Sequence, residues 1–171
     1  MKKIVHFILL FLLIGLDQFT KYFAITQLKG KESIQIIPKV LQLYYHENTG
    51  AVWGIMSGKI SILILTTTLI MLGMIALYFK LPKSKRYNLL RLILVFITAG
   101  AVGNLIDRCI HQYVVDFIYF ELINFPIFNV ADIYVTVSSI LLVLLSIFYY
   151  KDEDFEFLSK KEVSKDVNQN E

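Results

Sequence analysis

Four long, nearly uninterrupted apolar segments constrain the fold of this chain more than any other feature. They cover about residues 4–24, 60–79, 89–106 and 130–150. Each is long enough for a helix to cross the hydrocarbon core of a bilayer. In lipid a spanning segment must be a helix or part of a closed barrel, and the period-two alternation of a barrel is absent. The predicted class is therefore an all-α integral membrane protein, a bundle of four transmembrane helices.

The first apolar segment has some features of a secretory signal peptide. Lys2 and Lys3 precede an apolar run that begins at Ile4. No small-x-small cleavage site follows, and the apolar character continues past Asp17. The single cysteine, Cys109, lies deep in the chain, so it predicts neither an N-terminal lipid attachment nor an internal disulfide. We therefore expect a retained span.

The stretch between the first two spans, residues 29–59, is polar. Residues 33–37 and 40–45 alternate apolar with polar side chains and are rich in β-branched residues, which predicts a small sheet at about 33–45 on the membrane surface. The apolar run 51–56 contains Trp53 and is predicted to be a short interfacial helix or loop.

The remaining connections complete the domain organisation. Residues 105–130 are predicted to form a long loop. Residues 151–171 form a highly charged tail, which we expect to lie in solvent. The prediction is thus one membrane domain over residues 1–150 and a charged cytoplasmic tail.

The basic residues predict the orientation of the bundle. Lys2, Lys3 and five basic residues without any acid in the connection 80–91 favour the cytoplasmic side, whereas residues 105–130 contain one arginine and three acids. Both termini are therefore predicted to be cytoplasmic, in a multi-pass protein of the cytoplasmic membrane with its sheet on the extracytoplasmic side. The net charge of +3 is modest and no basic patch is interleaved with aromatics, so nucleic acid is not an expected partner.

Polar residues converge on one side of this predicted bundle. The end of span one, the end of span three, the start of span four and both long loops all lie there. Ionisable groups at membrane depth are costly and normally face the bundle interior or water. The residues are Asp17, Gln18 and Lys21; Glu47 and Asn48; Asn104, Asp107 and Arg108; Asp116; and Asn129 and Asp132.

Two of these acids suggest chemistry. Asp116 lies in an apolar run and Asp132 opens a span. Two carboxyls held close in a low-dielectric site share one proton, which supplies a base for water and an acid for a leaving amine. A proton relay, a transporter's ion site or a structural lipid-binding role uses membrane acids equally well. The three histidines are scattered without metal-ligand spacing, so no metal or cofactor is predicted.

Five short motifs carry a resemblance to a known family. They occur in family order over about residues 1–150, and the chain resembles the lipoprotein signal peptidases (signal peptidase II), which are bacterial membrane aspartyl proteases. The motifs are Asp17-Gln18-Phe19-Thr20-Lys21, Asn48-Thr49-Gly50-Ala51-Val52-Trp53-Gly54, Gly100-Ala101-Val102-Gly103-Asn104-Leu105-Ile106-Asp107-Arg108, Val114-Val115-Asp116-Phe117 and Phe128-Asn129-Val130-Ala131-Asp132.

The resemblance implies an activity and a set of site residues. The implied substrates are prolipoproteins with a diacylglyceryl-modified cysteine, cut just before that cysteine. It further implies membrane lipids as partners and no metal or cofactor. Because one chain holds every motif, we expect it to function as a monomer. Val52-Trp53 and Ile133-Tyr134 depart from the usual pattern, at the pocket rim and after the second acid. The implied roles are Asp116 and Asp132 as the catalytic dyad; Asn48, Gly50, Asn104, Arg108 and Asn129 as residues that bind substrate or support the dyad; and Asp17, Lys21 and Asp107 as structural support.

Overall fold

Among the residues that the structure describes, four helices are long and apolar enough to cross a membrane. The computed structural model describes residues 2–50 and 56–159, so most of the Trp53 segment lies outside the described residues. These four helices contain the four predicted apolar segments almost entirely, and their ends extend further than predicted at several points. They are α1 (Lys2–Leu28), α2 (Ile60–Lys80), α3 (Asn88–His111) and α4 (Val130–Phe148).

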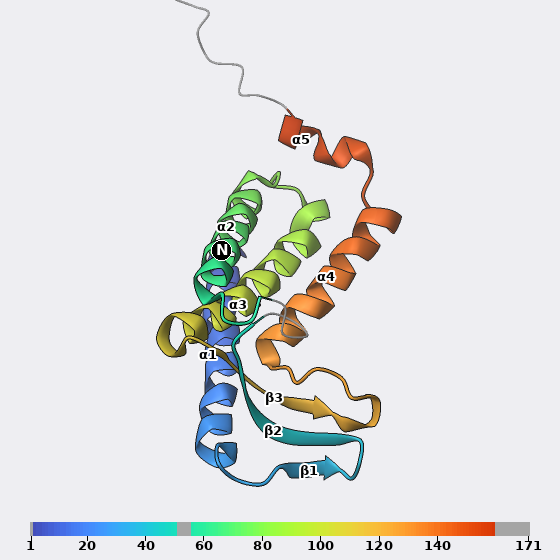
Figure 1. The fold of residues 1–171 in the computed structure, drawn as a ribbon. Coiled ribbons are helices and arrows are strands. Elements are labelled where there is room, and N and C mark those ends of the chain that lie inside the picture. The colour runs from blue at the N-terminus through green and yellow to red at the C-terminus, as the bar shows by residue number, and fades with distance from the viewer. Residues whose placement is uncertain (1, 51–55, 160–171) are drawn as a thin grey trace, which may run out of the picture.

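Helix α3 is the centre of the bundle. It packs against α1, α2 and α4, and it lies between them in Figure 1. Half of its most apolar stretch (50%) is buried, against 11%, 6% and 11% in α1, α2 and α4. The other three helices expose many large apolar side chains, as lipid-facing helices do. The polar residues of α3 are therefore enclosed by its neighbours.

Small residues allow α1 and α4 to approach α3 closely. A Cβ atom on Gly100 would lie 2.5 Å from the carbonyl oxygen of Ala131 and 2.7 Å from a methyl carbon of Val135 on α4. A Cβ atom on Gly103 would run into the carboxylate of Asp17 on α1. The absence of side chains at Gly100 and Gly103 therefore permits the close approach.

We expect Gly100→Ala to separate α3 from α4. Because the nearest atom is a backbone carbonyl, the clash is relieved only by moving a helix, at a cost of roughly 1–3 kcal/mol. Gly73→Ala is a matched control, since nothing lies within 4 Å of a Cβ atom at Gly73. Thermal unfolding in detergent should show a lower midpoint for Gly100→Ala alone, and equal midpoints would contradict the close approach.

A three-stranded antiparallel sheet lies at one end of the bundle (Figure 1). Its order is β1 (Ile34–Ile37), β2 (Leu41–Asn48) and β3 (Val114–Phe120). The prediction placed the whole sheet between spans one and two, which was incomplete, because β3 belongs to the predicted loop 105–130. The first four residues of β3 are all buried, so this strand lacks the alternation that marks a half-exposed strand.

The sheet packs on α1 through one face. Val115 and Phe117 of β3 form a buried cluster with Ala24 and Leu28 of α1. Successive side chains of a strand point to opposite faces, so Asp116 points away from α1. This alternation directs a carboxylate from the sheet toward the interior of the bundle end.

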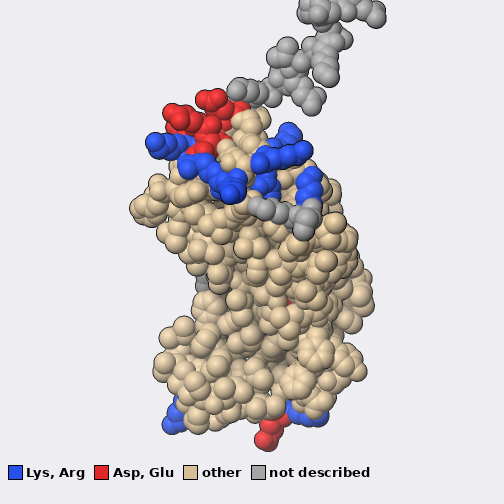
Figure 2. All heavy atoms as spheres, turned by 180° about the vertical axis from the view of Figure 1, so that it is seen from behind, with Lys and Arg blue, Asp and Glu red and all other residues tan. Residues whose placement is uncertain are grey.

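The opposite end of the molecule holds the described part of the tail, which forms a short 3-10 turn (Asp152–Phe155) and α5 (Glu156–Ser159). Asp154 accepts hydrogen bonds from the Arg86 guanidinium at 2.5 and 2.6 Å, and its carbonyl accepts one from the Tyr87 hydroxyl at 2.8 Å. The start of the predicted solvent-exposed tail is therefore docked on the α2–α3 connection. Charged side chains gather at this end, above a band without charge (Figure 2).

Candidate active site

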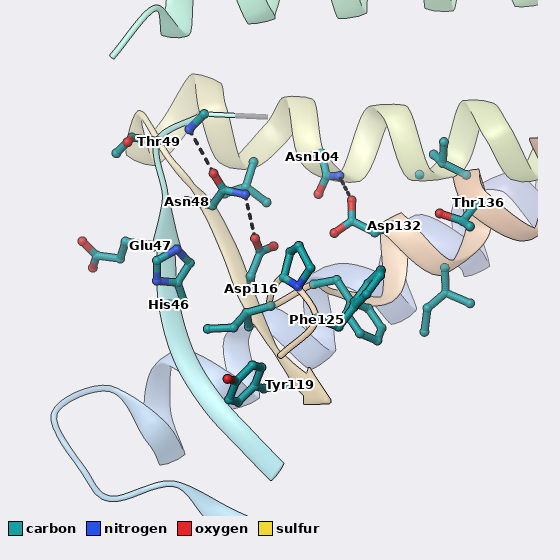
Figure 3. A pocket seen from close by; sticks show the side chains of 18 of the residues that line it. His46, Glu47, Asn48, Thr49, Asn104, Asp116, Tyr119, Phe125, Asp132 and Thr136 are labelled. Atoms are coloured by element: carbon teal, nitrogen blue, oxygen red, sulfur yellow. Dashed lines mark hydrogen bonds between the residues drawn. The ribbon is translucent and has the colours of Figure 1, made fainter. Parts of the chain in front are cut away.

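Asp116 and Asp132 line the same cavity, although they come from different elements. Asp116 lies on β3 and Asp132 lies in the first turn of α4. The cavity has a volume of about 1270 Å³ and extends between the sheet and helices α2, α3 and α4. Figure 3 shows both carboxylates directed into it. Asp116 is only 1% exposed, so the cavity reaches a well-shielded carboxyl.

Asn129 connects the two carboxylates. Its side-chain amide donates to Asp116 Oδ1 at 2.7 Å, and its backbone N–H donates to Asp132 Oδ2 at 3.1 Å. Asn129 is the N-cap of α4, and its side-chain oxygen accepts from the backbone N–H of Asp132 at 3.0 Å. Asparagine at the N-cap with an acid three residues later is a capping box. The start of α4 thus fixes Asp132 and holds Asp116 through one residue.

Two further amides complete the hydrogen bonding of the acids. Asn48 Nδ2 donates to Asp116 Oδ2 at 2.9 Å, and Asn104 Nδ2 donates to Asp132 Oδ1 at 2.8 Å (Figure 3). Every oxygen of the two carboxylates therefore accepts one hydrogen bond from the protein. The strand register explains the first contact, since His46 pairs with Asp116 and Asn48 stands two residues further on the same face of β2.

Gly50 and Arg108 hold Asn48 in place. The backbone N–H of Gly50 donates to Asn48 Oδ1 at 2.9 Å, and Arg108 Nη2 donates to the carbonyl of Gly50 at 3.3 Å. Within the described part of the chain, Nε of Arg108 is buried and has no hydrogen-bond partner. Arg108 also lines the cavity, which leaves a donor group beside the two acids.

Burial of the Asp116 carboxyl, and next the negative charge of Asp132, raises the pKa of Asp116 from 3.8 to about 7. The hydrogen bonds from Asn48 and Asn129 act in the opposite direction, because they stabilise the ionised form. A carboxyl with this pKa gains and loses a proton near neutral pH. The pair can therefore hold one proton while one member remains a base.

Lys21 lies behind the acids in a buried ionic cluster. Its ammonium group is 3.0 Å from Asp17 Oδ2, 3.0 Å from Asp107 Oδ2 and 2.9 Å from Asn104 Oδ1. Lys21 is only 2% exposed. Since Asn104 also donates to Asp132, the cluster of Asp17, Lys21 and Asp107 is linked to the cavity by one side chain.

The two acids of this cluster also bind backbone N–H groups. Asp17 accepts from Ala131 at 2.9 Å, which joins α1 to the start of α4. Asp107 accepts from Val115 at 3.0 Å, which joins α3 to β3. Gln18 adds hydrogen bonds to the carbonyl of Gly103 and to Asp107. Sequence analysis gave Gln18 no role. A polar amide next to Asp17 within an apolar segment was the feature that could have indicated one.

All ten site residues expected from the sequence lie in one hydrogen-bonded assembly, in two layers. Asn129, which was expected to bind substrate or support the dyad, is fully buried and hydrogen-bonds to both acids. Sequence analysis missed cavity residues such as Tyr44, Tyr119 and Phe125, which belong to none of the motifs. Among the described residues no group of three His, Cys, Asp or Glu is placed to hold a metal ion. The cavity layer comprises Asn48, Gly50, Asn104, Arg108, Asp116 and Asp132, and the buried layer comprises Asp17, Lys21, Asp107 and Asn129.

The sequence pattern of Signal peptidase (SPase) II matches residues 9–148. The chain belongs to the signal peptidase II family. It is therefore an enzyme of this family of aspartyl proteases. The lipoprotein signal peptidase of Clostridium novyi (strain NT) is 42% identical over 132 residues, which cover 75% of this chain and 88% of that protein. The lipoprotein signal peptidase of Bacillus subtilis (strain 168) is 37% identical over 139 residues, 80% of this chain and 89% of that protein.

Solved structures agree with this membership in the signal peptidase II family. One bacterial membrane enzyme determined at 2.3 Å resolution has a TM-score of 0.76 and 32% identity to this chain, and covers 94% of each chain. A second, determined at 1.9 Å, has a TM-score of 0.74 and 33% identity, and covers 85% of this chain and 94% of its own. The helical bundle with its small sheet is thus shared with solved membrane enzymes.

Proposed function

We propose that this enzyme removes signal peptides from prolipoproteins whose cysteine already carries diacylglyceryl, and that it cuts the peptide bond just before that cysteine. Relatives named lipoprotein signal peptidase support the substrate class. The carrying observation is the pair of acids in one cavity, Asp116 and Asp132, bridged by Asn129. The motifs all lie on one chain, and we propose that it acts as a monomer.

The proposed reaction uses the single proton of the Asp116–Asp132 pair. The ionised carboxylate takes a proton from a water molecule. At the same time the water oxygen forms a bond to the scissile carbonyl carbon. The protonated carboxyl then gives its proton to the nitrogen as the carbon–nitrogen bond breaks. The products are a signal peptide with a new carboxyl end and a lipoprotein with a free amine on its cysteine. The pair ends with one proton, as it began.

The cavity also offers groups for holding the substrate. Arg108 lines the cavity, and its guanidinium can bind a peptide carbonyl beside the acids. Apolar side chains from three helices line the remaining wall, including Ile70, Ile97 and Val137, and these suit the acyl chains of a diacylglyceryl group. We propose that the peptide lies along the sheet and the lipid along the helices.

Cleavage of a defined precursor tests this function. Purified protein in detergent is mixed with a diacylglyceryl-modified prolipoprotein, and the products are identified by mass spectrometry. We expect a mature chain that begins at the lipidated cysteine, and no cut in a precursor whose cysteine is replaced by serine. An intact lipidated precursor after incubation would refute the proposal.

The raised pKa of Asp116 predicts a loss of activity as pH rises through about 7. Above that pH both carboxyls are ionised, so no acid remains for the leaving nitrogen. Asn48→Ala removes a hydrogen bond that lowers this pKa, so the pKa should rise in the variant. Its activity should therefore persist to higher pH before it falls. The readout is kcat/KM against pH, with Glu32→Gln as an exposed control. An unchanged pH dependence in Asn48→Ala would contradict the assignment.

The same proton affects stability with a defined sign. The folded state binds it more tightly than the unfolded chain, because the folded pKa of Asp116 is raised above 3.8. Its stabilising contribution is therefore complete below pH 3.8 and is lost as pH rises through about 7. Mild alkali should thus lower the free energy of unfolding.

We further propose that the sheet and the cavity mouth lie on the extracytoplasmic side, with both termini in the cytoplasm. The basic connection between α2 and α3 supports this orientation. In a Cys109→Ser background, Glu32→Cys should react with a membrane-impermeant maleimide on intact cells, and Lys83→Cys should react only after the cells are opened. The reverse labelling would overturn the orientation.

A further inference from the structure

A second cavity lies at the end of the bundle opposite the sheet. Its volume is about 270 Å³, and it is bounded by α1, α2, α3 and the connection between α2 and α3. Four cations line it, Lys3, Lys83, Lys85 and Arg91, together with the hydroxyl of Ser84. Among the described residues, no aspartate or glutamate lines it. Three separate segments of the chain therefore converge their positive charges on one concave site.

The positive charge of this cavity is not neutralised within the described part of the chain. None of the ion pairs there involves Lys3, Lys83 or Lys85. Arg91 donates to backbone carbonyls, including that of Leu81 at 3.1 Å, and a carbonyl removes no charge. The nearby acid Asp154 is engaged by Arg86 instead. The cavity thus suits an anion small enough to enter it.

An exposed aromatic side chain lies beside the cavity. The ammonium group of Lys3 lies 5.2 Å from the ring centre of Phe79, so this ring is beside the cavity. Phe79 is 64% exposed, and Phe7 on α1 is 61% exposed. Figure 2 shows basic side chains at this end directly above a largely uncharged surface. The cavity therefore lies where headgroups meet acyl chains.

We propose that this cavity binds the phosphate of an anionic phospholipid, with the acyl chains against Phe7 and Phe79. The proposal goes beyond the proteolytic function, which uses the other end of the molecule. Orientation by the positive-inside rule explains why this connection is basic, but it requires no concave site shared by three segments. Basic pockets between helix ends are known to hold lipid phosphates. A free phosphate has the same chemistry but gains nothing from Phe7 and Phe79.

Lipid binding to matched charge variants tests the proposal. Lys83→Gln/Lys85→Gln removes two charges from the cavity, whereas Lys80→Gln/Lys151→Gln removes two from the same end without touching it. The full chain in neutral detergent is titrated with phosphatidylglycerol, phosphatidylcholine or inorganic phosphate, and bound lipid is counted by native mass spectrometry. We expect one tightly held phosphatidylglycerol, weakened about thirtyfold in the cavity variant and less than about threefold in the control.

The outcomes separate the possible sources of binding. Equal weakening in both variants would overturn the proposal, since general surface charge would explain it. Phosphatidylcholine binding as tight as phosphatidylglycerol binding would also overturn it. If millimolar inorganic phosphate displaces phosphatidylglycerol, the cavity binds a free anion and the lipid proposal is wrong. Cleavage activity should be unchanged in both variants. The lipid titration does not depend on cleavage, so it tests this proposal even if the proposed proteolytic function is wrong.

Discussion

Asp116→Asn and Asp132→Asn should each leave a folded protein whose kcat is lower by roughly 10³-fold or more. Asn129 bridges the two carboxyls, and both line the cavity, so the pair can share one proton beside a bound substrate. An asparagine at either position cannot take a proton from water or return one to the leaving nitrogen. Because the two acids act as a pair, the double variant should be hardly worse than either single variant.

The controls for this prediction follow from the hydrogen bonds of the pair. Both oxygens of each carboxylate accept a hydrogen bond, so the new amide of asparagine faces a donor and costs roughly 1–3 kcal/mol. Thermal unfolding must therefore accompany each assay. Glu32→Gln makes the same charge change at an exposed position and should keep full activity. A folded Asp116→Asn or Asp132→Asn protein with near wild-type turnover would sink the dyad assignment.

The gathering of the acids was predictable from sequence because consecutive spans must cross the bilayer in alternating directions. Four spans place the end of α1, the end of α3 and the start of α4 on one side, whatever their packing. Helical spacing also predicts the Asp17–Lys21 pair, which lies 3.0 Å apart. Topology thus predicted which residues meet, and the family resemblance predicted what they do.

Other parts of the site depend on contacts that no local pattern encodes. Lys21 also binds Asp107, a partner from another helix, and only packing of α1 on α3 brings them together. Strand β3 lacks alternation because both its faces are covered at Val114–Phe117. A register shift in β2 between Leu43 and His46 sets the pairing of His46 with Asp116, and bulges of this kind leave little trace in sequence.

Lys21→Met should be the most destabilising single change in the buried layer, at about 3–5 kcal/mol. It leaves the carboxylates of Asp17 and Asp107, which are 0% and 2% exposed, without a cation. Their remaining hydrogen bonds to backbone N–H groups do not neutralise two charges. Activity should fall as well, because Asn104 loses one of the two donors to its amide oxygen and keeps only Asn129 to orient it toward Asp132. The measurement is the free energy of unfolding, together with the rate of prolipoprotein cleavage.

The chain contains a matched surface pair for comparison. Lys29 lies 2.8 Å from Glu47, with side chains 51% and 39% exposed, so Lys29→Met should destabilise the protein far less than Lys21→Met. Adding Asp107→Asn to Lys21→Met removes one uncompensated charge and should restore part of the lost stability. If Asp107→Asn restores stability, the unpaired carboxylate accounts for most of the loss. If it does not, lost packing of the lysine stem accounts for it. If Lys21→Met costs no more than Lys29→Met, the buried cluster does not hold the helix ends together.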